Sequence, residues 1–190
     1  MSLPTKLSAV FGDALNSCLH DGVSVELDGL GVFQQRGEKP RFLASRRPKV
    51  FIAYVIEDLP LALRLYDALA GVGMNPWLDR NKLLPGQNWR RCIERAVDVS
   101  DFFIACFSQT AATKRGQFPY EVRYALKCAE RMPLDDIYFV PVRFEECKVP
   151  QRITSQIQYV DLFPNWEAGL HAMTQSLVQE WGARTGSRAA

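Results

Sequence analysis

The stretch Val50-Phe51-Ile52-Ala53-Tyr54-Val55 decides the fold class of this chain. It is a short, continuous apolar run, rich in β-branched and aromatic residues, which is typical of a strand buried on both faces. Such strands belong to parallel sheets that helices cover. Apolar residues from Leu61 to Val72 then recur at helical spacing, and Gly71 with Gly73 supplies a helix stop before a second short strand around Pro76-Trp77-Leu78. This part of the chain therefore predicts one β-α-β step.

The same alternation of strand and helix continues towards the C-terminus. Residues with helical spacing lie between Trp89 and Val97, between Phe118 and Ala129, and between Trp166 and Leu177. Apolar runs typical of strands cover 102–107 and 137–142, and a further short strand is expected at 158–161. Strands that alternate with helices predict an α/β fold with a doubly wound, mostly parallel sheet.

The first 48 residues follow a different pattern. Leu7 to Cys18 carry apolar residues at helical spacing, and Gly22 ends this helix. A β-hairpin follows, from Val23 to Leu27 and from Val32 to Arg36, with its turn at Asp28-Gly29-Leu30-Gly31. Residues from about Pro40 to Pro48 are expected to be a linker.

Length and composition indicate one main domain with a small appendage. The chain has 190 residues, of which 47% are hydrophobic, so it can bury a core of ordinary size. We expect an N-terminal helix-hairpin unit at 1–45, the α/β domain at 48–182 and a disordered tail at 183–190.

Charge and cysteine content exclude several classes of function. The formal net charge of +2 creates no global field that requires nucleic acid, an anionic membrane or an acidic substrate. Five scattered cysteines without a C-x-x-C pair, beside only two histidines, predict reduced thiols and no metal site. We find neither a signal peptide nor an apolar run of about 18 residues, so we expect a cytoplasmic protein without a membrane partner.

Loops at the carboxyl ends of parallel strands are the usual ligand sites of open α/β sheets. Three such loops carry polar residues: the first contains Asp58, the second runs from Asp79 to Trp89, and the third, from Ser108 to Pro119, opens a predicted helix. Glu121 should lie in the first turn of that helix, beside the buried face. It is either a site carboxylate or a residue that favours the helix dipole.

The stretch from Lys49 to Leu177 resembles bacterial TIR domains. Val50-Phe51-Ile52-Ala53-Tyr54 resembles the first box of the family, and the segment from Trp77-Leu78-Asp79 to Trp89 resembles its second strand and BB loop. Further matches are Ile93-Glu94-Arg95-Ala96, Phe107-Ser108, Tyr138-Phe139-Val140-Pro141-Val142-Arg143 and Tyr159-Val160-Asp161-Leu162. The resemblance implies a flavodoxin-like sheet of five parallel strands.

The resemblance also implies two family functions: cleavage of NAD at the nicotinamide–ribose bond, or assembly with other TIR domains as a signalling scaffold. In the cleaving members a glutamate early in the helix after the third strand is catalytic, and Glu121 occupies that position. NAD would be the substrate, and no further cofactor is expected. By family resemblance, such an enzyme would act in bacterial stress or anti-phage defence.

The resemblance makes five other residues candidates for substrate binding: Tyr54, Asp58, Asp79, Trp89 and Phe118. Core packing is the alternative for Tyr54 and Trp89, and an N-cap is the alternative for Asp58. The assembly loop would be Leu83, Leu84, Pro85 and Gly86, through which a non-enzymatic scaffold would self-associate.

Two residues depart from the family pattern. Ala53 replaces the serine of the first box, so any hydrogen bond from that serine is absent. Gln117 replaces a tryptophan that many family enzymes carry four residues before the glutamate, where it is tied to cyclisation of ADP-ribose. This departure makes a linear ADP-ribose product or base exchange the safer expectation, and cyclic ADP-ribose stays the alternative.

The helix-hairpin segment resembles part of the HU-like nucleoid proteins through Val23-Ser24-Val25-Glu26-Leu27-Asp28-Gly29-Leu30-Gly31-Val32-Phe33. Dimerisation through such a unit would bring two TIR domains together. A basic strip follows, including Lys39, Arg41, Arg46 and Arg47. It is either a solvated linker or a site for nucleic acid or a nucleotide signal.

Overall fold

A computed structural model of the chain describes residues 15, 17–21, 23, 25–27, 31–36, 39–44, 46–78 and 88–187. It divides the chain into two compact units, Met1–Arg47 and Pro48–Ala190. Each unit contains its own sheet, of three strands in the smaller unit and five in the larger.

The sheet of the larger unit consists of β4 (Lys49–Ala53), β5 (Asn75–Leu78), β6 (Phe102–Phe107), β7 (Phe139–Arg143) and β8 (Val160–Asp161). All neighbouring strands are parallel, in the order β5-β4-β6-β7-β8. This order is the flavodoxin-like one, in which the first strand lies inside the sheet. The predicted fold class is therefore confirmed.

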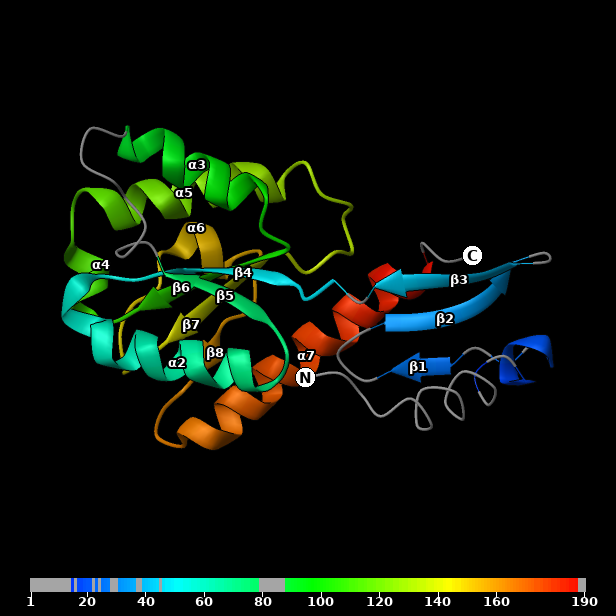
Figure 1. Cartoon of the computed structure of the whole chain (residues 1–190). Coiled ribbons are helices and arrows are strands. Elements are labelled where there is room, and N and C mark those ends of the chain that lie inside the picture. Colours follow the sequence, from blue (N-terminus) through cyan, green and yellow to red (C-terminus); the bar gives the residue numbers. More distant parts are fainter. Residues whose placement is uncertain are drawn as a thin grey trace. The chain divides into compact units, whose positions relative to one another are not determined.

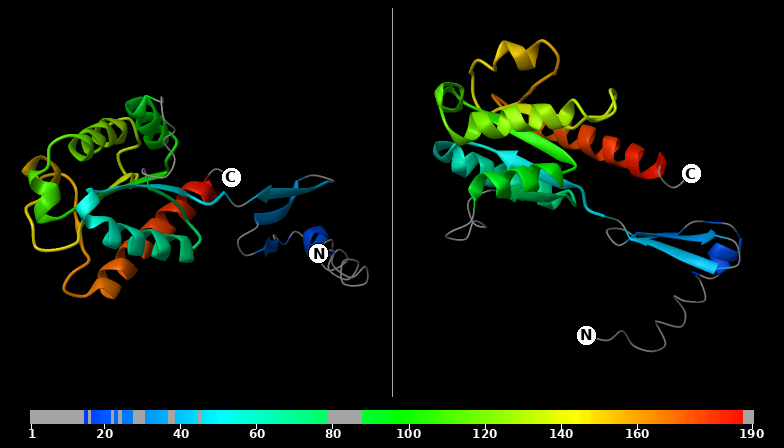
Figure 2. Two further views of the ribbon diagram at one scale, coloured as in Figure 1. Left: turned by 60° about the vertical axis from the view of Figure 1, so that its left-hand side comes forward. Right: turned by 90° about the horizontal axis from the view of Figure 1, so that it is seen from above.

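Helices cover both faces of this sheet (Figure 1). The helices on one face are α2 (Leu59–Gly71) and α7 (Trp166–Ser187). The other face carries α3 (Trp89–Asp98), α4 (Gln109–Thr113), α5 (Gln117–Ala129) and α6 (Gln151–Thr154). The two further views show the same layers (Figure 2).

The core forms two layers because successive side chains of a strand point to opposite faces. In β4, Val50 and Ile52 join the cluster that includes the α2 and α7 residues, whereas Phe51 and Ala53 join the cluster on the α3 and α5 side. Phe51 stacks on Phe103 with ring centroids 5.1 Å apart, and Phe103 stacks on Phe139 at 5.4 Å. These stacked rings tie three adjacent strands together across one face.

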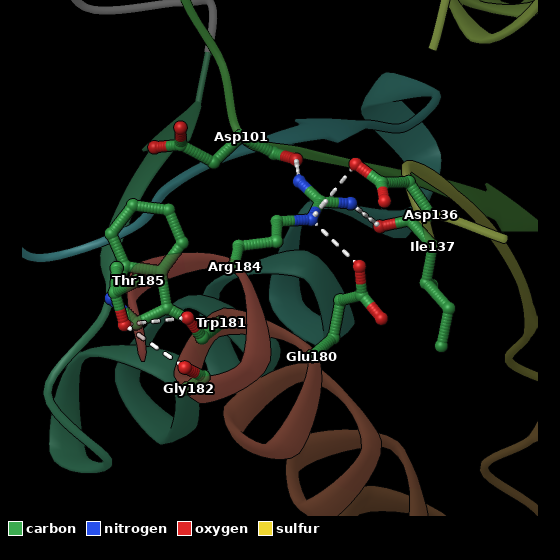
Figure 3. Close-up of polar contacts among 8 residues, drawn as sticks. All are labelled: Asp101, Asp136, Ile137, Glu180, Trp181, Gly182, Arg184 and Thr185. Carbon is green, nitrogen blue, oxygen red and sulfur yellow. Dashed lines mark hydrogen bonds and ion pairs between the residues drawn. The ribbon is translucent and has the colours of Figure 1, made fainter. Parts of the chain in front are cut away.

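Arg184 fixes the last turns of α7 to the amino edge of the sheet (Figure 3). Its guanidinium donates to the backbone oxygens of Asp101 at 3.2 Å and Ile137 at 2.7 Å. It also pairs with Glu180 at 2.7 Å and with Asp136 at 3.4 Å. The prediction of a disordered tail from residue 183 is therefore wrong for residues 183–187, which belong to α7.

Gly169 permits the close approach of α7 to the end of β8. A Cβ atom at this position would lie 2.0 Å from the backbone oxygen of Asp161 and 3.0 Å from its carbonyl carbon. No side chain fits at that distance, so a glycine is required in the first turns of the helix.

The smaller unit contains the antiparallel strands β1 (Val25–Leu27), β2 (Gly31–Arg36) and β3 (Lys39–Ala44), in the order β1-β2-β3. Pairing of β1 with β2 matches the expected hairpin. The start of the expected linker is wrong, because β3 pairs with β2 over its whole length and includes Pro40. Residues 15 and 17–20 are helical, inside the predicted N-terminal helix.

No helix in the described part of the chain has the length and apolar character that crossing a membrane requires. Likewise, the described residues include no group of three or more His, Cys, Asp and Glu side chains placed to hold a metal ion.

Candidate functional site

A cavity of about 160 Å³ lies at the carboxyl end of β4 and beside the start of α5. Strand β4 supplies Ile52 and is followed directly by three further lining residues, the last of which begins the 3-10 helix η1 (Ile56–Asp58). The remaining lining residues come from α5 and the segment before it. The full lining is Ile52, Tyr54, Val55, Ile56, Lys114, Arg115, Gln117, Phe118 and Glu121.

Glu121 is the buried carboxylate of this cavity, with 2% of its surface exposed. The side-chain amide of Gln117, one helical turn earlier, donates a hydrogen bond of 2.7 Å to Glu121 Oε1. A charge taken out of water is costly unless polar groups or ligands compensate for it. A buried carboxylate on a cavity wall is therefore a candidate for a functional rather than a structural group.

The position of Glu121 in its helix differs from the prediction. Helix α5 begins at Gln117, so Glu121 lies in the second turn and the first turn contains no acidic residue. Pro119 did not delay the helix, because a proline is tolerated in a first turn, where its missing N–H has no intrahelical partner. Gly116 makes this start possible by adopting a φ of 110°, which favours glycine. The helix-dipole interpretation of Glu121 is correspondingly weakened.

Tyr54 and Phe118 line the cavity together with Glu121. The three residues were predicted to belong to one site, and the structure places them at one cavity. Phe118 is also part of the core, since its ring meets that of Phe107 edge-on at 5.5 Å. Two aromatic residues and one acidic residue thus line the same cavity. Their roles in binding or catalysis stay a prediction.

Asp58 lies near the site but does not line the cavity. It occupies the N-cap position of α2 without a side-chain capping bond, and instead accepts a hydrogen bond of 2.6 Å from Ser108 Oγ. Burial raises the pKa of the Asp58 carboxyl; the hydrogen bond from Ser108 lowers it, and the charges of Glu145 and Glu57 raise it further. Asp58 therefore links the carboxyl ends of β4 and β6.

Two basic residues that sequence analysis missed, Lys114 and Arg115, are among those that line the cavity. They lie in the loop between α4 and α5, just before Gly116. Their location after the third strand of the sheet, six or seven residues before Glu121, was the available signal.

Trp89 does not line the cavity. It begins α3, is 39% exposed, and meets the ring of Tyr120 at 6.0 Å, with the guanidinium of Arg90 5.3 Å from its own ring. The structure thus places it in an aromatic cluster between α3 and α5. Asp79 and the predicted assembly loop of Leu83, Leu84, Pro85 and Gly86 lie outside the described residues.

The strand order and the cavity at the carboxyl edge define a flavodoxin-like α/β domain with a candidate ligand site. A family profile described as TIR domain matches residues 50–174. The chain belongs to the TIR domain family.

Solved structures with the same fold come from distant proteins. The TIR domain of the Toll-related receptor TRR-2 from Hydra magnipapillata gives a TM-score of 0.53 at 19% identity, covering 66% of this chain and 97% of that one. The CMP N-glycosidase BcmB of Clostridium botulinum gives 0.50 at 14% identity, covering 67% and 98% respectively. No curated protein matched the chain.

Proposed function

We propose that this TIR domain cleaves NAD at the bond between nicotinamide and ribose, with Glu121 as the catalytic carboxylate. The observation that carries the proposal is the burial of Glu121 at 2% exposure on the wall of a cavity that Tyr54 and Phe118 also line. That cavity lies at the carboxyl edge of the sheet, where open α/β folds bind their ligands.

The chemistry of this bond suits a site with one buried carboxylate. In NAD the nicotinamide ring is a cationic pyridinium. When the C1′–N bond breaks, nicotinamide leaves as a neutral molecule, so it needs no proton from a general acid. The ribose acquires oxocarbenium character, which the negative charge of Glu121 would stabilise. Water then adds to C1′ and loses a proton, giving ADP-ribose. Gln117, in place of an aromatic residue, favours this linear product.

The structure of BcmB shows one reaction that a protein with this fold performs. That protein is named as a CMP N-glycosidase, so its fold accommodates cleavage between a base and a ribose. At 14% identity the likeness shows the fold alone. Release of cytosine from CMP is therefore measured beside release of nicotinamide from NAD.

The decisive experiment compares the wild-type protein with Glu121→Gln, with and without a crowding agent that promotes assembly. We expect nicotinamide release by the wild type and a loss of at least about 100-fold in the variant, because loss of transition-state electrostatic stabilisation typically costs that much. Equal melting temperatures of the two proteins would exclude unfolding as the cause. A variant as active as the wild type would remove Glu121 from the mechanism.

A wild-type protein that self-associates yet releases no base would instead indicate a TIR–TIR signalling scaffold. In that case substitutions at Pro85 or Gly86 should reduce self-association, as measured by light scattering. This outcome would replace the enzyme with an interaction module.

We further propose that the enzyme is a cytoplasmic effector of bacterial stress or anti-phage defence, and that the unit Met1–Arg47 serves assembly or sensing. Arg46 and Arg47 are exposed, and Lys39 and Arg41 lie on β3. If these four residues bind nucleic acid, a gel shift should weaken steeply with salt and disappear when they are neutralised. A shift that persists after neutralisation would exclude this strip as the binding site.

A further inference from the structure

The residues that line the cavity include one acidic and two basic ones, and this composition bears on which substrates the site accepts. Glu121 is buried, whereas Lys114 and Arg115 are exposed. A carboxylate that stabilises a developing positive charge on ribose has no need of neighbouring cations, which oppose it. Basic residues beside such a site therefore call for a separate explanation.

The two basic residues differ in what they already bind. Lys114 forms a salt bridge with Glu57, so its charge is largely compensated within the protein. Within the ranges 46–78 and 88–187, the side chain of Arg115 forms no ion pair. Arg115 is thus the cation of the cavity that has charge to offer a ligand.

An arginine in this position matches a phosphate group. Its planar guanidinium presents several N–H donors in a fork that fits the oxygens of a phosphate. Helix α5 adds to the same field, because the positive end of its dipole lies at its amino end, just after Gly116. Arg115 and the amino end of α5 together favour an anion next to the cavity.

The volume of the cavity narrows the choice of ligand. About 160 Å³ is well below the roughly 300–1,000 Å³ usual for sites that enclose a whole ligand. The described lining therefore has room for only part of a dinucleotide, and under the proposed function Glu121 assigns that part to the ribose attacked. In NAD, the nearest anion to the ribose attacked is the 5′-phosphate of that same ribose.

We propose that Arg115 binds the 5′-phosphate of the ribose whose base is removed, so that the site accepts nucleotides and discriminates against nucleosides. This inference rests on the proposed function. Nicotinamide mononucleotide and NAD should both be cleaved, whereas nicotinamide riboside, which lacks the phosphate, should be a poor substrate.

Binding is measured first, by calorimetry, in the Glu121→Gln background so that no ligand is consumed. The ligands are nicotinamide mononucleotide and nicotinamide riboside. We expect the mononucleotide to bind about 10- to 100-fold more tightly, as for one charge-assisted phosphate contact. Arg115→Ala should remove this difference by weakening the mononucleotide alone, and Arg115→Lys should restore part of it.

Arg123→Ala is the matched control, because Arg123 is an exposed arginine of α5 that does not line the cavity. It should leave the preference for the phosphate unchanged. Equal binding of the two ligands to protein with Arg115 intact, or an equal loss in the Arg115 and Arg123 variants, would overturn the proposal.

Turnover is then measured in the background with Glu121 intact. The ratio of kcat/KM for the mononucleotide to that for the riboside should fall at least about 10-fold in Arg115→Ala. A phosphate preference in binding without any base release would overturn the proposed NAD cleavage and leave the phosphate site standing. Base release without a phosphate preference would overturn the phosphate site and leave the proposed NAD cleavage standing.

Discussion

Replacing Arg184 with alanine should destabilise the α/β domain without affecting its site. The wild-type guanidinium donates to two backbone oxygens, pairs with Glu180 and Asp136, and lies 5.1 Å from the ring of Phe102. To the free energy of unfolding, each of the two hydrogen bonds contributes about 1 kcal/mol. The two ion pairs and the contact with the Phe102 ring contribute about 1 kcal/mol in total. We expect a loss of about 3 kcal/mol, or a melting temperature lower by about 6–12 °C.

Urea denaturation followed by tryptophan fluorescence measures this loss, with Arg123→Ala as the control for removal of an exposed arginine. Arg184→Lys should be intermediate, because one ammonium group cannot reach both carbonyls and Glu180 at once. Nicotinamide release should be unchanged at temperatures where the variant is folded, since Arg184 binds at the amino edge and the cavity lies at the carboxyl edge. A loss below about 0.5 kcal/mol would refute the assignment of Arg184 as the residue that fixes the end of α7.

Three further substitutions test other contacts. Because the pKa of Asp58 is raised from 3.8, its ionised form opposes folding, and stability is lost as pH rises from about 3.8 through the folded pKa. Asp58→Asn should therefore gain melting temperature relative to the wild type between pH 3 and pH 7, and a relative loss would contradict this sign. Gly169→Ala should cost about 3 kcal/mol in urea unfolding, since its Cβ would overlap the backbone of Asp161; a cost under about 1 kcal/mol would show that α7 shifts freely. Gln117→Leu should reduce nicotinamide release about 10-fold, mainly in kcat, by removing the amide that orients Glu121; an unchanged kcat would make that hydrogen bond purely structural.

The larger fold was predictable because its strands are buried on both faces. β4 and β6 contain continuous apolar runs, and their central positions are fully buried in the structure. Glu121 was also placed correctly beside the buried face, from its spacing between Phe118 and Ala125. Local pattern sufficed wherever burial alone determined the residue type.

Features that depend on backbone geometry or on long-range contacts were not predictable. The predicted linker began at Pro40, within β3, yet β3 is an edge strand, where a proline is tolerated. The last helical turns of α7 depend on partners of Arg184 as distant in sequence as Asp101. The start of α5 depends on the positive φ of Gly116.

The cavity is lined by residues of the first strand of the parallel sheet and of the helix that follows the third strand. No single continuous segment of the chain can therefore form it. β4 begins at Lys49 and α5 ends at Ala129, and β6, which lies between them in sequence, pairs beside β4. Pairing of this kind, between segments far apart in sequence, is slow compared with formation of local structure. The site therefore exists only in a domain that has folded from β4 through α5, and whatever chemistry Glu121 performs depends on contacts between segments far apart in sequence.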